Sequence, residues 1–141
     1  MRFVIDASVA VRWYLAGESH PGADAVLSRV IEAPEDFAVP ELFFFEVLAV
    51  LGRTHPRPVQ TYVQAFLPVV EGGVFRHPMT ETLCTRAAGY VGRGLTGYDA
   101  CYAGLAAELG ALWITFDSRA HALLSADAVS VDLGQGLPTG W

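Results

Sequence analysis

The chain of 141 residues contains no lysine, and all nine of its basic residues are arginine. The absence of lysine excludes every mechanism that depends on a lysine nucleophile or a phosphate-binding lysine. Fifteen acidic residues give a formal net charge of −6, which disfavours nucleic-acid binding through bulk charge. A local group of arginines remains compatible with phosphate binding, because each guanidinium donates paired hydrogen bonds.

The chain also has few cysteines and no long apolar run. Cys84 and Cys101 lie 17 residues apart without a zinc-type spacing, so we expect two small core residues and no disulfide. No run approaches the 18 or so apolar residues of a membrane span, and Asp6 interrupts the apolar start of the chain. We therefore expect a cytoplasmic protein with no membrane partner.

Just over half of the residues (52%) are hydrophobic, and apolar runs alternate with helical patterns. This order favours an α/β fold with a parallel sheet in a single domain, 1–141. We predict strands at 3–5, 37–39, the end of 71–77, 112–116 and 129–133. We predict helices at 7–15, 23–32, from Pro40 through Glu46, at 59–70 with an end or kink at Pro68, and at 80–94, 96–111 and 118–124. We predict loops at 16–22 and 33–36, and a loose tail at 134–141.

Glu46 stands in the apolar segment FFFEVLAVL, residues 43–51. On a helix its nearest neighbours are apolar, and none of them is basic. An unpaired buried charge costs several kcal/mol even after relaxation, comparable to the net stability of a small domain. The position therefore predicts a partner from elsewhere in the fold or from solution.

Three further acids fall where a parallel sheet places functional groups. Asp6 and Asp117 directly follow predicted strands, and Asp99 lies in the first turn of a predicted helix. Each also has a structural alternative: Asp6 and Asp117 as helix N-caps, and Asp99 as part of a capping-box-like start with Thr96.

Four carboxylates in one place would repel each other strongly. At an effective dielectric of about 20, each pair about 5 Å apart costs roughly 3 kcal/mol. A hard divalent cation such as Mg²⁺ or Mn²⁺ removes this cost and would supply the missing partner of Glu46. Arg12 and Arg119 each lie within seven residues of one of these acids, so they are candidates for phosphate binding or simply solvated surface residues.

The segments VIDAS (4–8), PELFFFEVL (40–48), LTGYDACYAGLAAELG (95–110) and WITFD (113–117) resemble, in order and spacing, the four acidic motifs of PIN-domain ribonucleases. VapC toxins of toxin–antitoxin pairs are the most similar branch. The resemblance implies a three-layer α/β/α fold with a central, mainly parallel sheet of about five strands. It also implies a Mg²⁺- or Mn²⁺-dependent endoribonuclease that acts on RNA.

The same resemblance assigns roles to individual residues. It implies that Asp6, Asp99 and Asp117 bind the metal and that Glu46 completes the catalytic site, often through water. Ser8 and Thr115 match small hydroxyl positions beside that site. The resemblance further implies a homodimer that a cognate antitoxin inhibits. The chain departs from the pattern in having an alanine where the family often has an asparagine, three residues after the helix glutamate.

Two other functions remain open at this point. Phosphoaspartyl phosphatases and receiver domains also place an aspartate after the first strand of a parallel sheet. Their sites resemble ones that need a lysine near the phosphoryl group, so the absence of lysine from this chain counts against both. A PIN-like binding module without nuclease activity, acting only through its partner, is the other alternative that the sequence leaves open.

Overall fold

A computed structural model describes all 141 residues of the chain. Its centre is a five-stranded sheet with the strand order β3-β2-β1-β4-β5, in which every neighbouring pair is parallel. The strands are β1 (Phe3–Ile5), β2 (Phe37–Pro40), β3 (Phe75–His77), β4 (Leu112–Thr115) and β5 (Ser130–Asp132). The predicted α/β fold with a parallel sheet is therefore confirmed.

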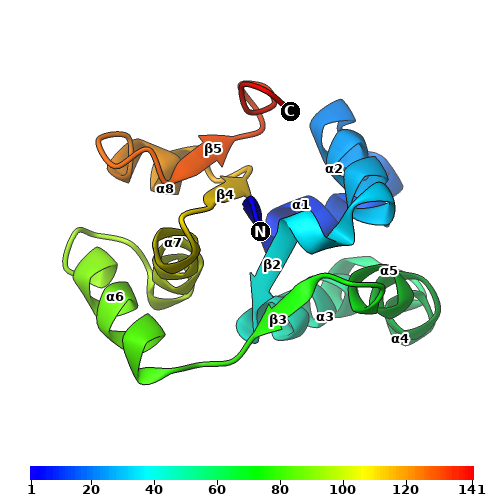
Figure 1. Cartoon of the computed structure of the whole chain (residues 1–141). Coiled ribbons are helices and arrows are strands. Elements are labelled where there is room, and N and C mark those ends of the chain that lie inside the picture. The colour runs from blue at the N-terminus through cyan, green and yellow to red at the C-terminus, as the bar shows by residue number, and fades with distance from the viewer.

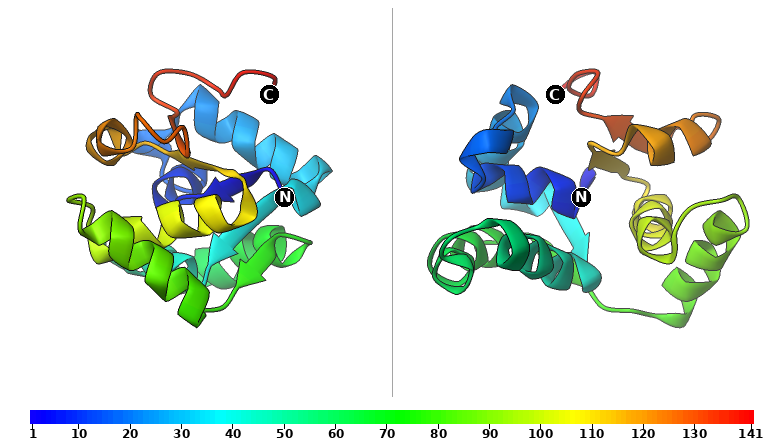
Figure 2. Two further views of the ribbon diagram at one scale, coloured as in Figure 1. Left: turned by 60° about the vertical axis from the view of Figure 1, so that its left-hand side comes forward. Right: turned by 180° about the vertical axis from the view of Figure 1, so that it is seen from behind.

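Helices cover both faces of this sheet, which gives three layers (Figure 1). One side carries α1 (Ala7–Ala10), α2 (Pro21–Glu32), α3 (Leu42–Thr54), α4 (Pro58–Thr61) and α5 (Leu67–Glu71). On the other side α7 (Gly97–Leu109) packs on β1, β2 and β4, and α6 (Glu81–Val91) packs on α7. Figure 2 shows the same separation from two further directions, with α8 (Ser118–Leu123) beside β5.

Strands β1 and β2 are short, wholly apolar and buried, as parallel strands between helical layers commonly are. Every residue of β1 and β2 is buried. Cys101 joins the core as predicted, whereas Cys84 is exposed. None of the helices combines the length and the hydropathy that crossing a bilayer requires.

The first predicted helix boundaries were wrong in detail. The helix expected over 7–15 ends at Ala10 and continues only as a 3-10 turn, Val11–Trp13. The loop expected over 16–22 contains another 3-10 turn, and α2 already begins at Pro21. Proline suits the first helical turn, and the Nδ1 atom of His20 accepts a hydrogen bond from the N–H of Gly22 at 2.9 Å.

Two prolines also differ from their predicted places. Pro40 is the last residue of β2, paired with His77, rather than part of the following helix. Pro68 does not end the helix, which was one of the two outcomes predicted for it, because the chain stays helical from Pro58 to Glu71. A π-helical turn, Tyr62–Phe66, directly precedes α5, and this wider turn leaves room for the proline ring.

The C-terminal segment ends against the sheet. The ring of Trp141 lies 4.9 Å from the ring of Phe3 and 6.4 Å from that of Phe37. The guanidinium of Arg29 lies 4.9 Å from the centre of the Trp141 ring. The end of the segment expected to be a loose tail is thus anchored on β1 and β2.

Candidate active site

Two of the four acids lie at the point where the strand order reverses. β1 pairs with β2 on one side and with β4 on the other, and the chain leaves these strands toward α1 and α8. Asp6 directly follows β1, and Asp117 comes two residues after the end of β4. The carboxyl edge at such a switch point is where open parallel sheets place their ligand sites.

Asp6 is buried and held by two donors. Its Oδ2 atom accepts a hydrogen bond from the N–H of Ser8 at 2.8 Å, which caps α1. Its Oδ1 atom accepts one from the indole Nε1–H of Trp113 at 3.0 Å. Burial raises the pKa of Asp6 to about 6, although the hydrogen bonds from Ser8 and Trp113 lower it.

Asp117 also caps a helix, as the structural alternative predicted. Its Oδ1 atom accepts a hydrogen bond from the N–H of Ala120 at 2.9 Å, at the start of α8. Its own N–H donates to the hydroxyl of Thr115 at 3.0 Å. The cap uses only one carboxylate oxygen, so the cap and a role in ligand binding are compatible at this residue.

Asp99 lies in the first turn of α7, where Thr96 is the N-cap. The N–H of Asp99 donates to the Thr96 hydroxyl at 3.2 Å, so this cap engages the backbone of Asp99 and not its carboxylate. Burial raises the pKa of Asp99, and the negative charge of Asp117 raises it further, whereas Thr96 and Arg119 lower it.

Glu46 lies one turn into α3, and its Oε1 atom is buried without a hydrogen-bond partner. The hydroxyl of Tyr102, on α7, is likewise buried without a partner. Burial raises the pKa of Glu46 to about 7, and Asp6 and Asp99 raise it further, whereas the nearby Tyr102 hydroxyl lowers it. No basic side chain forms an ion pair with Glu46. The basic partner that would explain this residue is therefore missing from the protein itself.

The structure brings the four acids into one electrostatic environment, although they come from four separate parts of the chain. The charge of Asp99 raises the pKa of Asp6, and both of these acids raise the pKa of Glu46. Asp117 in turn raises the pKa of Asp99. These pairwise effects link the four acids electrostatically, with Asp117 joined to the others through Asp99.

The arrangement is open rather than a closed cage. No three histidine, cysteine, aspartate or glutamate side chains are grouped closely enough to enclose a metal ion. Five of the surface hollows, with volumes of about 200 to 430 Å³, are lined by none of these four acids. Any ion bound here would need water or substrate oxygens to complete its coordination.

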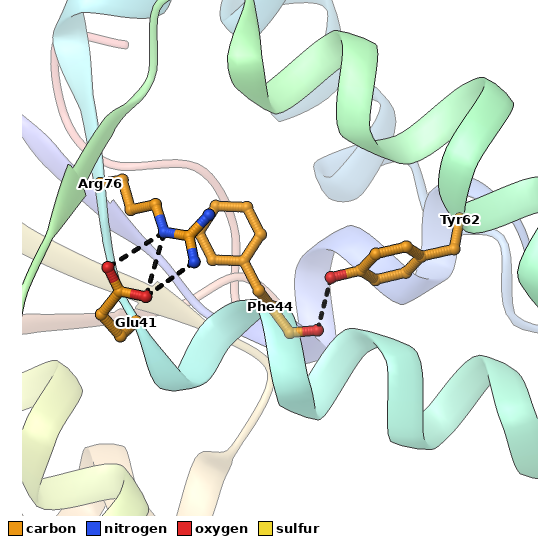
Figure 3. A network of polar contacts seen from close by, with 4 residues as sticks. All are labelled: Glu41, Phe44, Tyr62 and Arg76. Atoms are coloured by element: carbon orange, nitrogen blue, oxygen red, sulfur yellow. Dashed lines mark hydrogen bonds and ion pairs between the residues drawn. The ribbon is translucent and has the colours of Figure 1, made fainter.

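A separate polar network fixes the start of the helix that carries Glu46 (Figure 3). Arg76 on β3 forms a bidentate ion pair with Glu41, with its closest contact at 2.8 Å. Its guanidinium also lies 4.1 Å from the centre of the Phe44 ring. The hydroxyl of Tyr62 donates to the backbone carbonyl of Phe44 at 2.9 Å. The first turn of α3 is thus tied both to β3 and to the π-helical turn.

The remaining predicted site residues lie around the acids in different ways. Arg12 stacks on Phe116, with 4.1 Å from its guanidinium to the ring centre, and its Nε atom is buried without a partner. Arg119 is exposed and close enough to lower the pKa of Asp99. The Ser8 hydroxyl accepts a hydrogen bond from the N–H of Phe116 at 3.2 Å. Thr115 is fully buried.

Two aromatic residues that lie next to the acids were not predicted from the sequence as site residues. Trp113 donates to Asp6, and Tyr102 faces Glu46; their rings stack with centres 5.7 Å apart. Both lie inside the acidic motifs, and Tyr102 stands three residues after Asp99, on the same helix face. That spacing was the available signal, but apolar packing alone explained these residues equally well.

One known protein family and several solved structures resemble this chain. The family model of the PIN domain matches residues 3–124, a range that contains all four acids. Among solved structures, FitAcB from Neisseria gonorrhoeae matches with a TM-score of 0.69 and 17% identity, over 91% of this chain and 95% of that one. FitAB bound to the IR36 DNA fragment matches with a TM-score of 0.69 and 17% identity, over 92% and 93%.

A third structure, PAE2754 from Pyrobaculum aerophilum, matches with a TM-score of 0.65 and 22% identity, over 96% of this chain and 91% of that one. These likenesses show the fold. No curated protein matches the sequence. The family model covers most of the chain and the fold agrees with it, so the chain belongs to the PIN domain family.

Proposed function

We propose that this protein is a divalent-metal-dependent endoribonuclease and the toxin of a toxin–antitoxin pair. PIN domains are generally nucleases. The observation that carries the proposal is the buried Oε1 atom of Glu46, which has no partner although the charges of Asp6 and Asp99 act on it. An ionised carboxylate in this place needs a cation from solution to neutralise it.

The residues present fit Mg²⁺ or Mn²⁺. The available ligands are all carboxylate oxygens, which hard cations prefer. Asp6, Asp99 and Asp117 would hold the ion, and Glu46 would complete the site directly or through water. Mg²⁺ usually keeps several waters and is held by one or two carboxylates together with substrate phosphates, which suits the open arrangement. When bound, such an ion polarises the phosphodiester and activates a water molecule.

The residues of the chain then have separate tasks. Glu46 would accept a proton from the attacking water, because its carboxylate has no basic partner and lies within the electrostatic reach of Asp6 and Asp99. Arg12, whose Nη1 atom donates to the carbonyl of Glu18 at 3.1 Å, and exposed Arg119 would bind substrate phosphates at the rim through their remaining guanidinium donors. The backbone partners of the Ser8 and Thr115 hydroxyls support positioning roles for these two residues beside the substrate.

The proposed partners are RNA, a second copy of the chain and a cognate antitoxin, with the whole range 1–141 acting as one cytoplasmic domain. Exposed Phe45 and Leu48 flank Glu46 along α3. They form an apolar surface beside the catalytic acids that an antitoxin segment would cover. Co-expression with the product of the neighbouring reading frame tests the antitoxin, and light scattering of the purified chain tests the homodimer.

One observation favours a second candidate function, a binding module without nuclease activity. No three acidic side chains are close enough to enclose a metal by themselves. In addition, FitAB, which shares this fold, is bound to a DNA fragment. A module of this kind would keep the acids and bind its partner while cleaving no RNA.

A cleavage assay separates the two candidates. Purified protein is incubated with single-stranded RNA and Mg²⁺ or Mn²⁺, with EDTA as the metal-free control. We expect metal-dependent cleavage that Asp6→Asn, Asp99→Asn and Asp117→Asn each reduce by more than about 100-fold without unfolding the domain. Asp24→Asn, which changes an exposed acid on α2, is the matched control and should cleave normally. Normal cleavage by any of the three site variants would show that the site is misassigned.

A further inference from the structure

A separate hollow lies between α6 and α7, away from the four acids. Its volume is about 430 Å³, and its lining consists of Thr85, Arg86, Gly89, Tyr90, Arg93 and Ala107. Two of the nine arginines of the chain line this one hollow, and no acidic residue does. In a protein with a net charge of −6, such a cationic hollow favours a negatively charged ligand.

Tyr90 supplies the aromatic ring of this hollow, and Arg93 contacts one side of that ring. The guanidinium of Arg93 lies 5.6 Å from the centre of the Tyr90 ring. Arg93 in turn forms an ion pair with Asp127 and donates to the backbone carbonyl of Leu123 at 3.2 Å. Beside the ring, Gly89 leaves open space, because a Cβ atom built there would meet nothing within 4 Å. Tyr90 is therefore a preorganised platform with room next to it.

Arg86 is the free cation of the hollow. It is exposed, and its guanidinium has no ion pair and no hydrogen bond in the structure. Arg86 and Arg93 line the hollow together with Tyr90. Burial and the charge of Asp127 raise the pKa of Tyr90, whereas Arg93 and Arg86 lower it; Asp127 is itself paired with Arg93, which leaves Arg86 as the unpaired charge. A fixed aromatic ring next to an unpaired guanidinium is the combination that binds the base and the phosphate of a nucleotide.

Two helices connect the hollow to the catalytic acids. α7 runs from Asp99 in its first turn to Ala107 in the hollow, and eight residues of helix span about 12 Å. α8 begins next to Asp117 and ends at Leu123, whose carbonyl binds Arg93. Figure 1 shows α6, α7 and α8 on the same side of the molecule. A single strand of a few nucleotides can span this distance, because an extended strand advances several Å per nucleotide and single-strand sites in other folds already bind at least about four nucleotides.

We propose that the hollow between α6 and α7 is a nucleotide subsite, in which Tyr90 stacks on a base of the RNA strand and Arg86 binds its phosphate. The inference rests on the proposed ribonuclease function and adds a place where substrate binds outside the catalytic acids. A free mononucleotide has the same chemistry as one unit of the strand, so the experiment includes both.

The test uses fluorescence anisotropy to measure how tightly the full chain, in EDTA, binds a fluorescently labelled single-stranded RNA of about 12 nucleotides. We expect Arg86→Gln and Tyr90→Leu each to weaken binding about tenfold, as loss of a phosphate contact or a stacked base does. Tyr90→Phe keeps the ring and should bind normally. Arg57→Gln is the matched control, because Arg57 is an exposed arginine beside α4, on the other side of the molecule.

Equal losses with Arg57→Gln and Arg86→Gln would overturn the subsite, because they would show that bulk charge alone sets the affinity. Equal losses with Tyr90→Phe and Tyr90→Leu would also overturn it, because stacking would not be involved. Calorimetry with adenosine monophosphate forms the second arm. Binding of this mononucleotide that Tyr90→Leu abolishes, with unchanged RNA affinity, would overturn the RNA assignment in favour of a free nucleotide.

Cleavage kinetics with Mg²⁺ distinguish failure of the subsite from failure of the proposed function. If wild-type protein cleaves RNA, we expect Arg86→Gln and Tyr90→Leu to raise KM with little change in kcat. Cleavage with KM unchanged in these variants would overturn the subsite alone. RNA binding that depends on Tyr90, without any cleavage, would overturn the nuclease and leave the subsite standing.

Discussion

Glu41 and Glu46 lie five residues apart at the start of the same helix, yet their surroundings are opposite. Glu41 is paired with Arg76, and hydrogen bonds from that guanidinium lower its pKa. Glu46 has no basic partner, and its pKa is raised to about 7 by burial and by neighbouring acids. The first carboxylate stabilises the fold when it ionises, whereas the second destabilises it.

This difference separates a carboxylate that is paired within the fold from one that has no partner in it. The Glu41 network orients the first turn of α3 through Phe44 and Tyr62, and its ion pair is partly exposed to solvent. The acids around Glu46 repel one another and gain stability only when a proton or a cation neutralises them. A fold tolerates such a cluster at a cost in stability, and perturbed carboxylates of this kind are typical of functional sites.

The largest effect is expected for Glu46→Gln. If Glu46 has the proposed catalytic role, its removal should lower cleavage by at least about 100-fold. The same change removes a buried charge, so the free energy of unfolding without metal should stay the same or increase. Cleavage assays and chemical denaturation in EDTA measure the two quantities. A large loss of stability in EDTA would instead indicate a structural ion pair at Glu46.

The next effect is the pH dependence of stability without metal. The pKa of Asp6 is raised to about 6 in the folded protein, so the folded state holds its proton at pH values where the unfolded chain has lost it. Stability therefore falls as pH rises, by roughly 1 to 2 kcal/mol between about pH 5 and pH 8 from Asp6 alone. Denaturation in EDTA at both pH values measures this slope.

Two variations sharpen the pH experiment. Asp6→Asn should make the slope shallower without abolishing it, because its amide does not titrate whereas Glu46, whose pKa is also raised, still does. Adding Mg²⁺ at about pH 8 should restore the lost stability, because the ion binds only the folded, ionised site. Stability that rises with pH in EDTA would mean that the acids are neutralised by groups of the protein itself.

A smaller effect is expected at Tyr62. Tyr62→Phe removes the hydroxyl that donates to the carbonyl of Phe44, which should cost about 1 kcal/mol in the free energy of unfolding. Cleavage should fall less than tenfold, because the helix that carries Glu46 is only loosened. Tyr98→Phe is the matched control, since Tyr98 is 66% exposed and its hydroxyl has no partner. Equal losses in both variants would show that the hydrogen bond has no stabilising role.

The smallest effect on stability is expected at Glu41. Glu41→Gln breaks a partly exposed ion pair and should cost no more than about 1 kcal/mol near neutral pH. The pKa of Glu41 is lowered, so this stability is present above the unfolded pKa and disappears as pH falls through the folded one. Denaturation at neutral and acid pH measures it. Loss of cleavage as large as that of Glu46→Gln would place Glu41 in the site.

Much of the fold was predictable because burial and periodicity are local signals. The five strands were predicted near their observed positions, and a parallel sheet followed from their alternation with helices. The errors occurred where tertiary contacts override local preference. Pro40 stays in β2 because it pairs with His77, and the helix containing Pro68 continues because a π-helical turn precedes it.

The candidate site was predictable only as a set of acids. Each of Asp6, Asp99 and Asp117 has a capping relationship that explains it locally, and the structure shows those caps. Only Glu46 lacked a local explanation. Trp113 and Tyr102 were not identified, because an apolar motif does not reveal which aromatic side chain turns its polar atom toward a carboxylate.

The sequence by itself determined the α/β layering, the positions of the four acids relative to strands and helices, and the absence of any lysine to neutralise them. Only the tertiary structure decided that these acids act on one another and that Glu46 finds no basic partner. It also decided that Arg86 and Tyr90 line one hollow with Arg93. The reason is physical: burial and periodicity act along the chain, whereas charge repulsion and pairing depend on distances that strand order and helix packing set.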